Sequence, residues 1–341
     1  MRQYFDAVFG NRETCTALGK SIESDALYHA LLIEGDTGSG KRTLAKEISK
    51  AVLCECKNDV TRPLPCGECR ACQLAERGLI PDIHYFSRGE RTTLGVEAVR
   101  EMIDDTVMAA TEFDSKIYIF EDAHTMTVQA QNALLKVLEE PPHGVNIILL
   151  CESADAMLTT IRSRARLLRM QRFTAEEIRR FLFEKEPGTL RENELSSILP
   201  RAEGSIGRAL ALLSPQSMSA AKKENDMIFS LLSALTDKSY APLYSALSVL
   251  PQKREELCRF LRLFHTALRD LILLTREEKT PLIFFSSPDA VPEKLKGFRI
   301  GSLIAFADAT ENTIEALTRN ANITTAETAL ACRLRNAQKE R

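Results

Sequence analysis

The sequence has no apolar run long enough to cross a bilayer, and no strong excess of charge of one sign. A membrane-spanning helix needs roughly 18 to 20 consecutive apolar residues, and the first residues also lack the apolar segment of a secretory signal. We therefore expect a cytoplasmic protein that does not bind membranes. Its 45 basic and 47 acidic side chains give a net charge of −2. This balance excludes a protein that coats nucleic acid through bulk positive charge.

The sequence also lacks internal repeats and low-complexity tracts. Its 341 residues exceed what one hydrophobic core usually supports, so two or three domains are expected. Three short apolar stretches alternate with longer segments of helical periodicity in the first half, which predicts buried parallel strands with helices between them. These stretches are residues 30–34, 117–120 and 147–151.

The second half of the sequence has no comparable strand signals. Residues 175–213 have the pattern of a small helical unit that ends near Pro215, and the remainder is mostly amphipathic helix, as in residues 255–274 and 300–317. The stretch 280–297 is rich in Pro, Ser and Lys and is predicted to be a loop. The chain is therefore expected to combine an α/β domain with an all-helical region.

A glycine-rich loop follows the first apolar stretch and precedes a helical segment. It matches the first seven positions of a P-loop, in which backbone N–H groups converge on phosphate oxygens at a helix N-terminus and a lysine adds positive charge. The seven positions are Gly35, Asp36, Thr37, Gly38, Ser39, Gly40 and Lys41. The next position should carry the hydroxyl that holds Mg²⁺, but it is Arg42, and Thr43 comes one residue late. One residue rotates a helical side chain by about 100°, so Thr43 is not expected to substitute.

The second apolar stretch ends in two acids, Glu121 and Asp122. This pattern is typical of a Walker B strand, in which the first acid arranges Mg²⁺ and the second polarises the attacking water. The usual order is Asp then Glu, and here it is inverted. Glu121 is one methylene too long and Asp122 one too short, and shifts of about 1 Å can cost on the order of a hundredfold in rate. These acids either have a weakened catalytic role or only end a strand.

Five cysteines lie close together in the sequence, although nine cysteines in a large cytoplasmic chain do not indicate a disulfide framework. Cys66, Cys69 and Cys72 have three-residue spacing, and one upstream thiol would complete a four-sulfur structural zinc site without an open position for catalysis. Cys54 is the expected fourth ligand and Cys56 is the alternative.

A basic segment, residues 162–166, follows the third apolar stretch. A guanidinium on a rigid element can act as an arginine finger, which stabilises the charge on the γ-phosphate of a neighbouring subunit. Taken alone, the segment also fits a solvated basic surface. The same alternatives stay open for Arg162, Arg166, Arg169 and Arg172, which could line an interface or face water.

Together these segments resemble the bacterial DNA polymerase III clamp-loader subunits of the AAA+ class. The most specific match is residues 131–142, which are similar to the family's NALLKxLEEPP segment. The cysteine cluster lies where the family inserts its zinc module. Residues 162–165 match the family's SRC motif with Ala165 in place of its cysteine, so the resemblance assigns the finger to Arg164. The resemblance extends from about Phe9 to Ser214.

Within this family, three departures favour a delta-prime-type subunit over the ATP-hydrolysing gamma/tau motor. Arg42 replaces the Mg²⁺ ligand, the Walker B acids are inverted, and Gly207 stands where the motor has its sensor-2 arginine. Residues 93–100 also look like the delta-prime counterpart. Lys41 and the intact glycines leave ATP or ADP binding open, whereas Mg²⁺ binding and ATP hydrolysis by this chain alone are not expected.

The resemblance implies an architecture and a set of partners. It implies an AAA+ P-loop domain over residues 1–172 with a zinc module at about 54–72, a helical lid over 173–214 and a helical collar over 215–341. The implied partners are the gamma/tau and delta subunits in a hetero-pentamer, the sliding clamp, and primed DNA contacted through the assembled complex. Rival interpretations are a gamma/tau-like motor, a self-sufficient P-loop ATPase or nucleotide kinase, and a zinc-stabilised interaction module without nucleotide.

Overall fold

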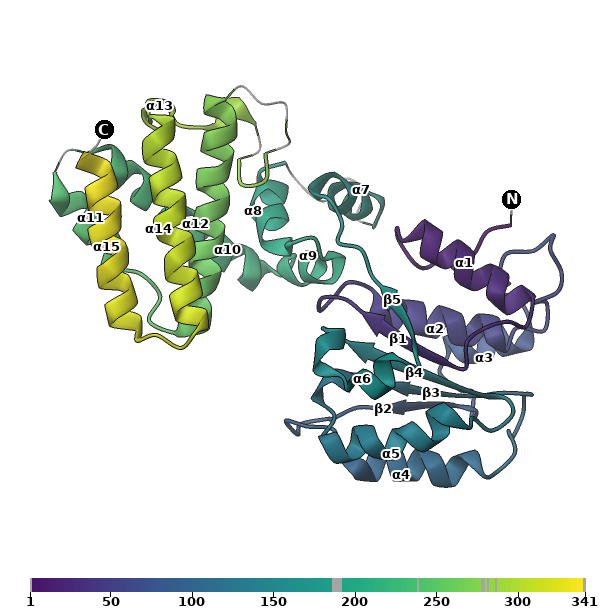
Figure 1. Cartoon of the computed structure of the whole chain (residues 1–341). Coiled ribbons are helices and arrows are strands. Elements are labelled where there is room, and N and C mark those ends of the chain that lie inside the picture. The colour runs from purple at the N-terminus through teal and green to yellow at the C-terminus, as the bar shows by residue number, and fades with distance from the viewer. Residues whose placement is uncertain are drawn as a thin grey trace. The chain divides into compact units, whose positions relative to one another are not determined.

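The computed structural model describes residues 2–185, 192–237, 239–276, 280, 282–285 and 287–339. The chain divides into two compact units (Figure 1). The first unit contains the residues up to Phe173 together with Ser205–Gly207, and the second contains Thr174–Gly204 and the residues from Arg208 onward. The division at Phe173 lies next to the predicted end of the P-loop domain. The separation of a lid at 173–214 from a collar at 215–341 stays a prediction.

A five-stranded parallel sheet forms the centre of the first unit, in the order β2-β3-β4-β1-β5. The strands are β1 (Ala30–Glu34), β2 (Ile83–Phe86), β3 (Lys116–Phe120), β4 (Val145–Cys151) and β5 (Arg166–Arg169). The central strands consist almost entirely of buried residues, as expected for parallel strands covered on both faces. The predicted parallel α/β fold is thus confirmed.

Helices cover both faces of this sheet (Figure 1). Alternate residues of a strand point to opposite faces, so Leu31 and Ile33 contribute to one core cluster and Leu32 to the other. The first cluster includes residues of α1 (Arg12–Glu23), α2 (Lys41–Val52) and α3 (Arg70–Glu76). The second includes residues of α4 (Val96–Thr106) and α5 (Val128–Glu139). Helices thus pack against both faces of the sheet, and this packing holds the ends of its strands in place.

Two strands were missing from the sequence-based prediction, and both lie at an edge of the sheet. β2 has the sequence Ile-His-Tyr-Phe, and β5 begins and ends with arginine. An edge strand is less buried than a central one and often carries charge, so the continuous apolar pattern that revealed the central strands is absent from both.

The second unit is helical in the described residues. Its helices are α7 (Ala175–Lys185), α8 (Glu192–Ala202), α9 (Ile206–Leu212, which begins in the first unit), α10 (Pro215–Thr236), α11 (Tyr240–Leu247), α12 (Arg254–Thr275), α13 (Glu293–Lys296), α14 (Ile300–Thr318) and α15 (Ile323–Lys339). The predicted loop over 280–297 was partly wrong, because the 3-10 helix Pro288–Ala290 and the short helix α13 lie within it.

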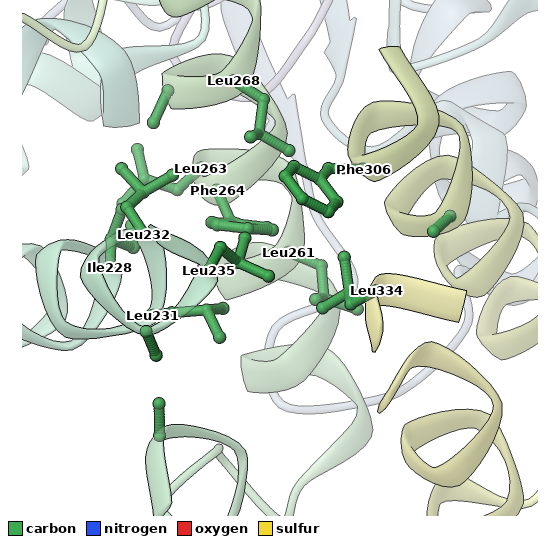
Figure 2. Packing of buried hydrophobic residues seen from close by; sticks show 14 of the residues in the cluster. Ile228, Leu231, Leu232, Leu235, Leu261, Leu263, Phe264, Leu268, Phe306 and Leu334 are labelled. Atoms are coloured by element: carbon green, nitrogen blue, oxygen red, sulfur yellow. The ribbon is translucent and has the colours of Figure 1, made fainter. Parts of the chain in front are cut away.

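The long helices of this unit enclose one hydrophobic core. Leu231, Leu235, Phe264, Phe306 and Leu334 meet there from four different helices (Figure 2). On α12 the buried residues recur every three or four positions, which gives the apolar stripe of an amphipathic helix. None of the helices in the described part of the chain is both long and apolar enough to cross a membrane.

Candidate functional site

The glycine-rich loop connects β1 to α2, as the P-loop pattern predicts. Gly38 and Gly40 have φ values of 76° and 94°, which side-chain-bearing residues rarely adopt. In the described part of the chain, the N–H groups of Gly38, Gly40 and Lys41 have no hydrogen-bond acceptor. These N–H groups lie at the N-terminus of α2, where the helix dipole favours an anion. The loop therefore fits a phosphate group.

Lys41 is turned back onto the loop. Its Nζ donates hydrogen bonds to the carbonyl oxygens of Gly35, at 2.5 Å, and Asp36, at 2.9 Å. Burial lowers the pKa of the Lys41 ammonium group. A bound phosphate would have to compete with two carbonyl oxygens for this ammonium group.

Residues 205–207 contact the same loop within the first unit. Ser205 Oγ donates a hydrogen bond to the Thr37 carbonyl oxygen, and the Gly207 N–H donates to the Gly38 carbonyl oxygen, both at 2.9 Å. A Cβ atom on Gly207 would lie 2.6 Å from Gly38 Cα. The absence of a side chain at Gly207, which the family resemblance placed at the sensor-2 position, therefore lets residues 205–207 lie directly against the P-loop.

The carboxyl end of β3 places the two Walker B acids beside the loop. Arg42 forms an ion pair with Glu121, and Arg88 Nε lies 3.4 Å from Asp122 Oδ2. The Arg42 guanidinium therefore contacts the acid that would arrange Mg²⁺. A second positive charge at that carboxylate opposes cation binding, so the residues present do not fit Mg²⁺. The Thr43 side chain is exposed.

Sequence reasoning missed a third acid at this edge of the sheet. Glu152 follows β4 and accepts a hydrogen bond from the Thr37 hydroxyl group. Its position was predictable, because parallel strands bring their carboxyl ends to one edge, but an isolated acid after a strand carries no motif.

Four thiols come together beside α2 and α3. The sulfur atoms of Cys54, Cys66, Cys69 and Cys72 all lie within 4.8 Å of one another, and Cys56 is not part of this group. Two of the pairs, Cys66–Cys72 and Cys54–Cys69, are 3.9 Å apart. Zn–S bonds of about 2.3 Å in a tetrahedron separate sulfur atoms by about 3.8 Å.

Local structure arranges these four thiols. Gly67 has a φ of 74° and turns the chain after Cys66, so that the Cys69 N–H donates to Cys66 Sγ at 3.3 Å. Hydrogen bonding from the Cys72 thiol lowers the pKa of the Cys54 thiol to about 5. Burial raises the pKa of the Cys69 thiol, and the hydrogen bond to Cys54 raises that of the Cys72 thiol. The fit to a structural zinc ion therefore rests on the four sulfur donors and their spacing.

Arg164 lies between α6 (Thr159–Arg162) and β5. Its guanidinium contacts Glu139 Oε1 at 2.7 Å and donates to the Thr160 carbonyl oxygen at 3.1 Å. Glu139 belongs to the segment that matched the family most specifically. Each of the two terminal nitrogens of the Arg164 guanidinium therefore has a partner within the chain. The Arg164 side chain is nevertheless 36% exposed, so another molecule can reach it.

The neighbouring arginines also have acidic partners within the chain. Arg162 pairs with Asp155, Arg169 with Glu34 and Arg172 with Asp36. The fourth arginine, Arg166, lies over the Tyr28 ring, 5.7 Å from its centroid. The charges of the three paired arginines are therefore balanced within the chain. These pairs are mostly exposed, and exposed ion pairs contribute little stability, about 0 to 1 kcal/mol.

The first unit is thus a P-loop α/β domain with a cluster of four thiols. Residues 10–174 match the family model described as "DNA polymerase III, delta subunit". The chain is 34% identical to DNA polymerase III subunit gamma of Buchnera aphidicola over 62% of this chain and 58% of that protein. It is 32% identical to subunit tau of Escherichia coli over 62% of this chain and 32% of that protein. Residues 10–174 are therefore similar to DNA polymerase III subunits of the delta, gamma and tau type.

The match covers less than two thirds of these relatives' own length. Among solved structures, a gamma subunit-related protein from Thermotoga maritima superposes with a TM-score of 0.44 at 18% identity, over 95% of this chain and 99% of that one. This likeness is too weak to compare individual residues.

Proposed function

We propose that this protein is a delta-prime-type subunit of a DNA polymerase III clamp loader. It would not hydrolyse ATP itself, and it would supply Arg164 as an arginine finger to the ATP site of a neighbouring motor subunit while the sliding clamp is loaded onto primed DNA. Its partners would be gamma/tau and delta subunits in the cytoplasm, with DNA contacted through the assembled complex.

The observation that carries this proposal is the ion pair between Arg42 and Glu121. In an active P-loop ATPase, a hydroxyl group at the position of Arg42 and an acid at the position of Glu121 arrange Mg²⁺. Here a guanidinium occupies the first position and neutralises the second. Mg²⁺ would have to displace the Arg42 guanidinium from Glu121 without gaining a hydroxyl ligand in exchange. The unpaired N–H groups of the loop still accommodate phosphate, so nucleotide binding without Mg²⁺ stays within this proposal.

Three features support the assignment of the finger to Arg164. The side chain follows a short helix and precedes a strand, its guanidinium is anchored by Glu139 and the Thr160 carbonyl group, and about a third of it is exposed. An anchored guanidinium loses little side-chain entropy when it meets a second anion. A γ-phosphate from a neighbour would compete with the Glu139 carboxylate for the same group.

The four-thiol cluster is assigned a structural role in this proposal. Zinc held by Cys54, Cys66, Cys69 and Cys72 has no open coordination position for a substrate. It would tie the segment after α2 to the N-terminus of α3.

A gamma/tau-like motor is the second candidate, because the relatives named above are gamma and tau subunits. The two candidates differ in whether the chain uses Mg²⁺ and hydrolyses ATP. The way to separate them is equilibrium titration of the purified chain with a fluorescent ATP analogue, with and without Mg²⁺, together with steady-state hydrolysis.

For the delta-prime-type subunit we expect no turnover and an affinity that does not depend on Mg²⁺. The variant Arg42→Thr restores the hydroxyl and frees Glu121, so its affinity should become Mg²⁺-dependent. Brisk hydrolysis by the unaltered chain would favour the motor or a self-sufficient ATPase. If no nucleotide binds, co-purification with gamma/tau subunits separates a nucleotide-free delta-prime from a zinc-stabilised interaction module.

A further inference from the structure

The Arg164 guanidinium has one partner that comes from a different element of the fold. Its Nη1 group donates to the Thr160 carbonyl oxygen at 3.1 Å and to the Ser163 hydroxyl oxygen at 3.3 Å. Both residues are at most four positions from Arg164 in the chain, so they move together with it. Glu139 belongs to α5, and its Oε1 atom lies 2.7 Å from Arg164 Nη2. Glu139 therefore provides the contact that fixes the guanidinium relative to another helix.

Glu139 has a fixed place because it is the last residue of α5. The preceding residue, Leu138, is buried and belongs to the same core cluster as Ile161 of α6 and Ala165. Ile161 is fully buried and Ala165 is 7% exposed. Because Ala165 directly follows Arg164, one hydrophobic core anchors the backbone next to both members of the ion pair. The distance between Glu139 and Arg164 is therefore set by the packing of α5 against α6.

The contacts of Arg164 leave part of its guanidinium group available to an anion. A guanidinium has five N–H groups on three nitrogen atoms. Two of the contacts use Nη1 and one uses Nη2. No acceptor for the Nε–H group is present among the residues that the structure describes. A phosphate oxygen can therefore bind at Nε while the ion pair with Glu139 is kept.

The ion pair contributes little to the stability of the fold, but it restricts the Arg164 side chain. The side chains of Arg164 and Glu139 are 36% and 50% exposed, and exposed ion pairs stabilise proteins weakly. An arginine side chain without such a partner samples many rotamers. Misplacing a catalytic group by about 1 Å can cost on the order of a hundredfold in rate. A contact that matters little for folding can therefore matter for catalysis.

We propose that Glu139 is the positioning residue of Arg164. Its carboxylate holds the guanidinium in the orientation that presents the Nε–H group to a γ-phosphate bound by the neighbouring subunit. Glu139 does not touch the nucleotide and acts only through Arg164. This inference rests on the arginine-finger role proposed above.

The test is single-turnover ATP hydrolysis by a complex reconstituted from this protein, gamma/tau motor subunits and delta. The kinetic phase that Arg164→Ala slows most identifies the site that the finger serves. We expect Glu139→Ala to slow this phase by about tenfold or more, without a change in the ATP concentration at half-saturation. Asp155→Ala is the matched control, because it removes the acidic partner of Arg162 in the same way. It should leave the phase unchanged.

A double variant separates positioning from a general structural role. When Arg164 is already alanine, Glu139→Ala should cause no further loss of rate. A further loss in that background, or an unchanged phase in Glu139→Ala alone, would overturn the inference and leave the arginine finger intact. Faster hydrolysis by Glu139→Ala would show that the carboxylate competes with the phosphate, which would also overturn it. If Arg164→Ala slows no phase, the arginine-finger role itself is wrong and Glu139 has nothing to position.

Discussion

Replacing Gly207 by alanine tests how closely residues 205–207 pack on the P-loop. The added Cβ would lie 2.6 Å from Gly38 Cα and 2.9 Å from the Gly38 carbonyl oxygen. Ordinary contacts of this kind begin at about 3.5 Å, so the backbones must separate by about 1 Å. Both contacted atoms belong to the backbone and cannot rotate away.

The expected loss of stability follows from three contributions. Overpacking costs about 1 to 3 kcal/mol, and the hydrogen bond from the Gly207 N–H, worth about 1 kcal/mol, is weakened. Alanine in place of helical glycine returns about 1 kcal/mol. We therefore expect Gly207→Ala to lower the free energy of unfolding of the first unit by about 1 to 3 kcal/mol, measured by urea denaturation.

Gly301→Ala is the matched control. Gly301 lies in α14, and nothing is found within 4 Å of a Cβ atom built there. Its substitution should be neutral or slightly stabilising. If both variants were equally stable, the contact between Gly207 and the P-loop would not exist in solution, and residues 205–207 would not pack against the loop as described.

Three further predictions concern the thiols and two buried polar groups of the first unit. Cys69→Ser should abolish zinc retained by the purified protein, measured by elemental analysis, whereas Cys56→Ser should keep it; equal zinc contents would contradict the assigned ligand set. Asp82 is fully buried and accepts hydrogen bonds from the three backbone N–H groups of residues 111–113. Asp82→Ala should therefore lower the free energy of unfolding by about 3 kcal/mol or more. A decrease below about 1 kcal/mol in urea denaturation would refute this. The Tyr118 hydroxyl donates to Asp105 at 2.6 Å, and Tyr118→Phe should cost about 1.5 to 3 kcal/mol at pH 7. Burial opposes ionisation of Asp105, but the hydrogen bonds from Tyr118 and Lys116 outweigh it and lower the pKa of Asp105 below 3.8. The stability that Asp105 contributes is therefore present above pH 3.8 and is lost as the pH falls through the lowered pKa. The difference in unfolding free energy between Tyr118→Phe and the unaltered protein should shrink over that pH range.

The central strands could be predicted from sequence because burial on both faces requires an unbroken apolar run. Residues 30–34 form β1 as predicted. The edge strands β2 and β5 could not be predicted in this way. Their residues face solvent on one side, so polar side chains such as His84 and Arg166 interrupt the pattern.

The motifs identified the components of the candidate site but not their partners. The sequence showed that Arg42 departs from the P-loop pattern, but a residue 79 positions away, Glu121, forms the ion pair. The spacing of three cysteines predicted a metal site, and only the fold distinguishes Cys54 from Cys56 as the neighbour of the other three. Contacts between distant segments depend on the topology of the sheet, which local patterns do not specify.

The measurement that tests the central claim most directly is ATP hydrolysis by a complex reconstituted from this protein and gamma/tau motor subunits. Arg164→Ala is compared with Arg162→Ala, whose side chain is also about one third exposed and also paired with an acid. An arginine finger contributes on the order of a thousandfold or more to its site. We predict that Arg164→Ala removes the turnover of one site while Arg162→Ala retains it. Unchanged hydrolysis with Arg164→Ala, or hydrolysis by this chain alone, would contradict the claim.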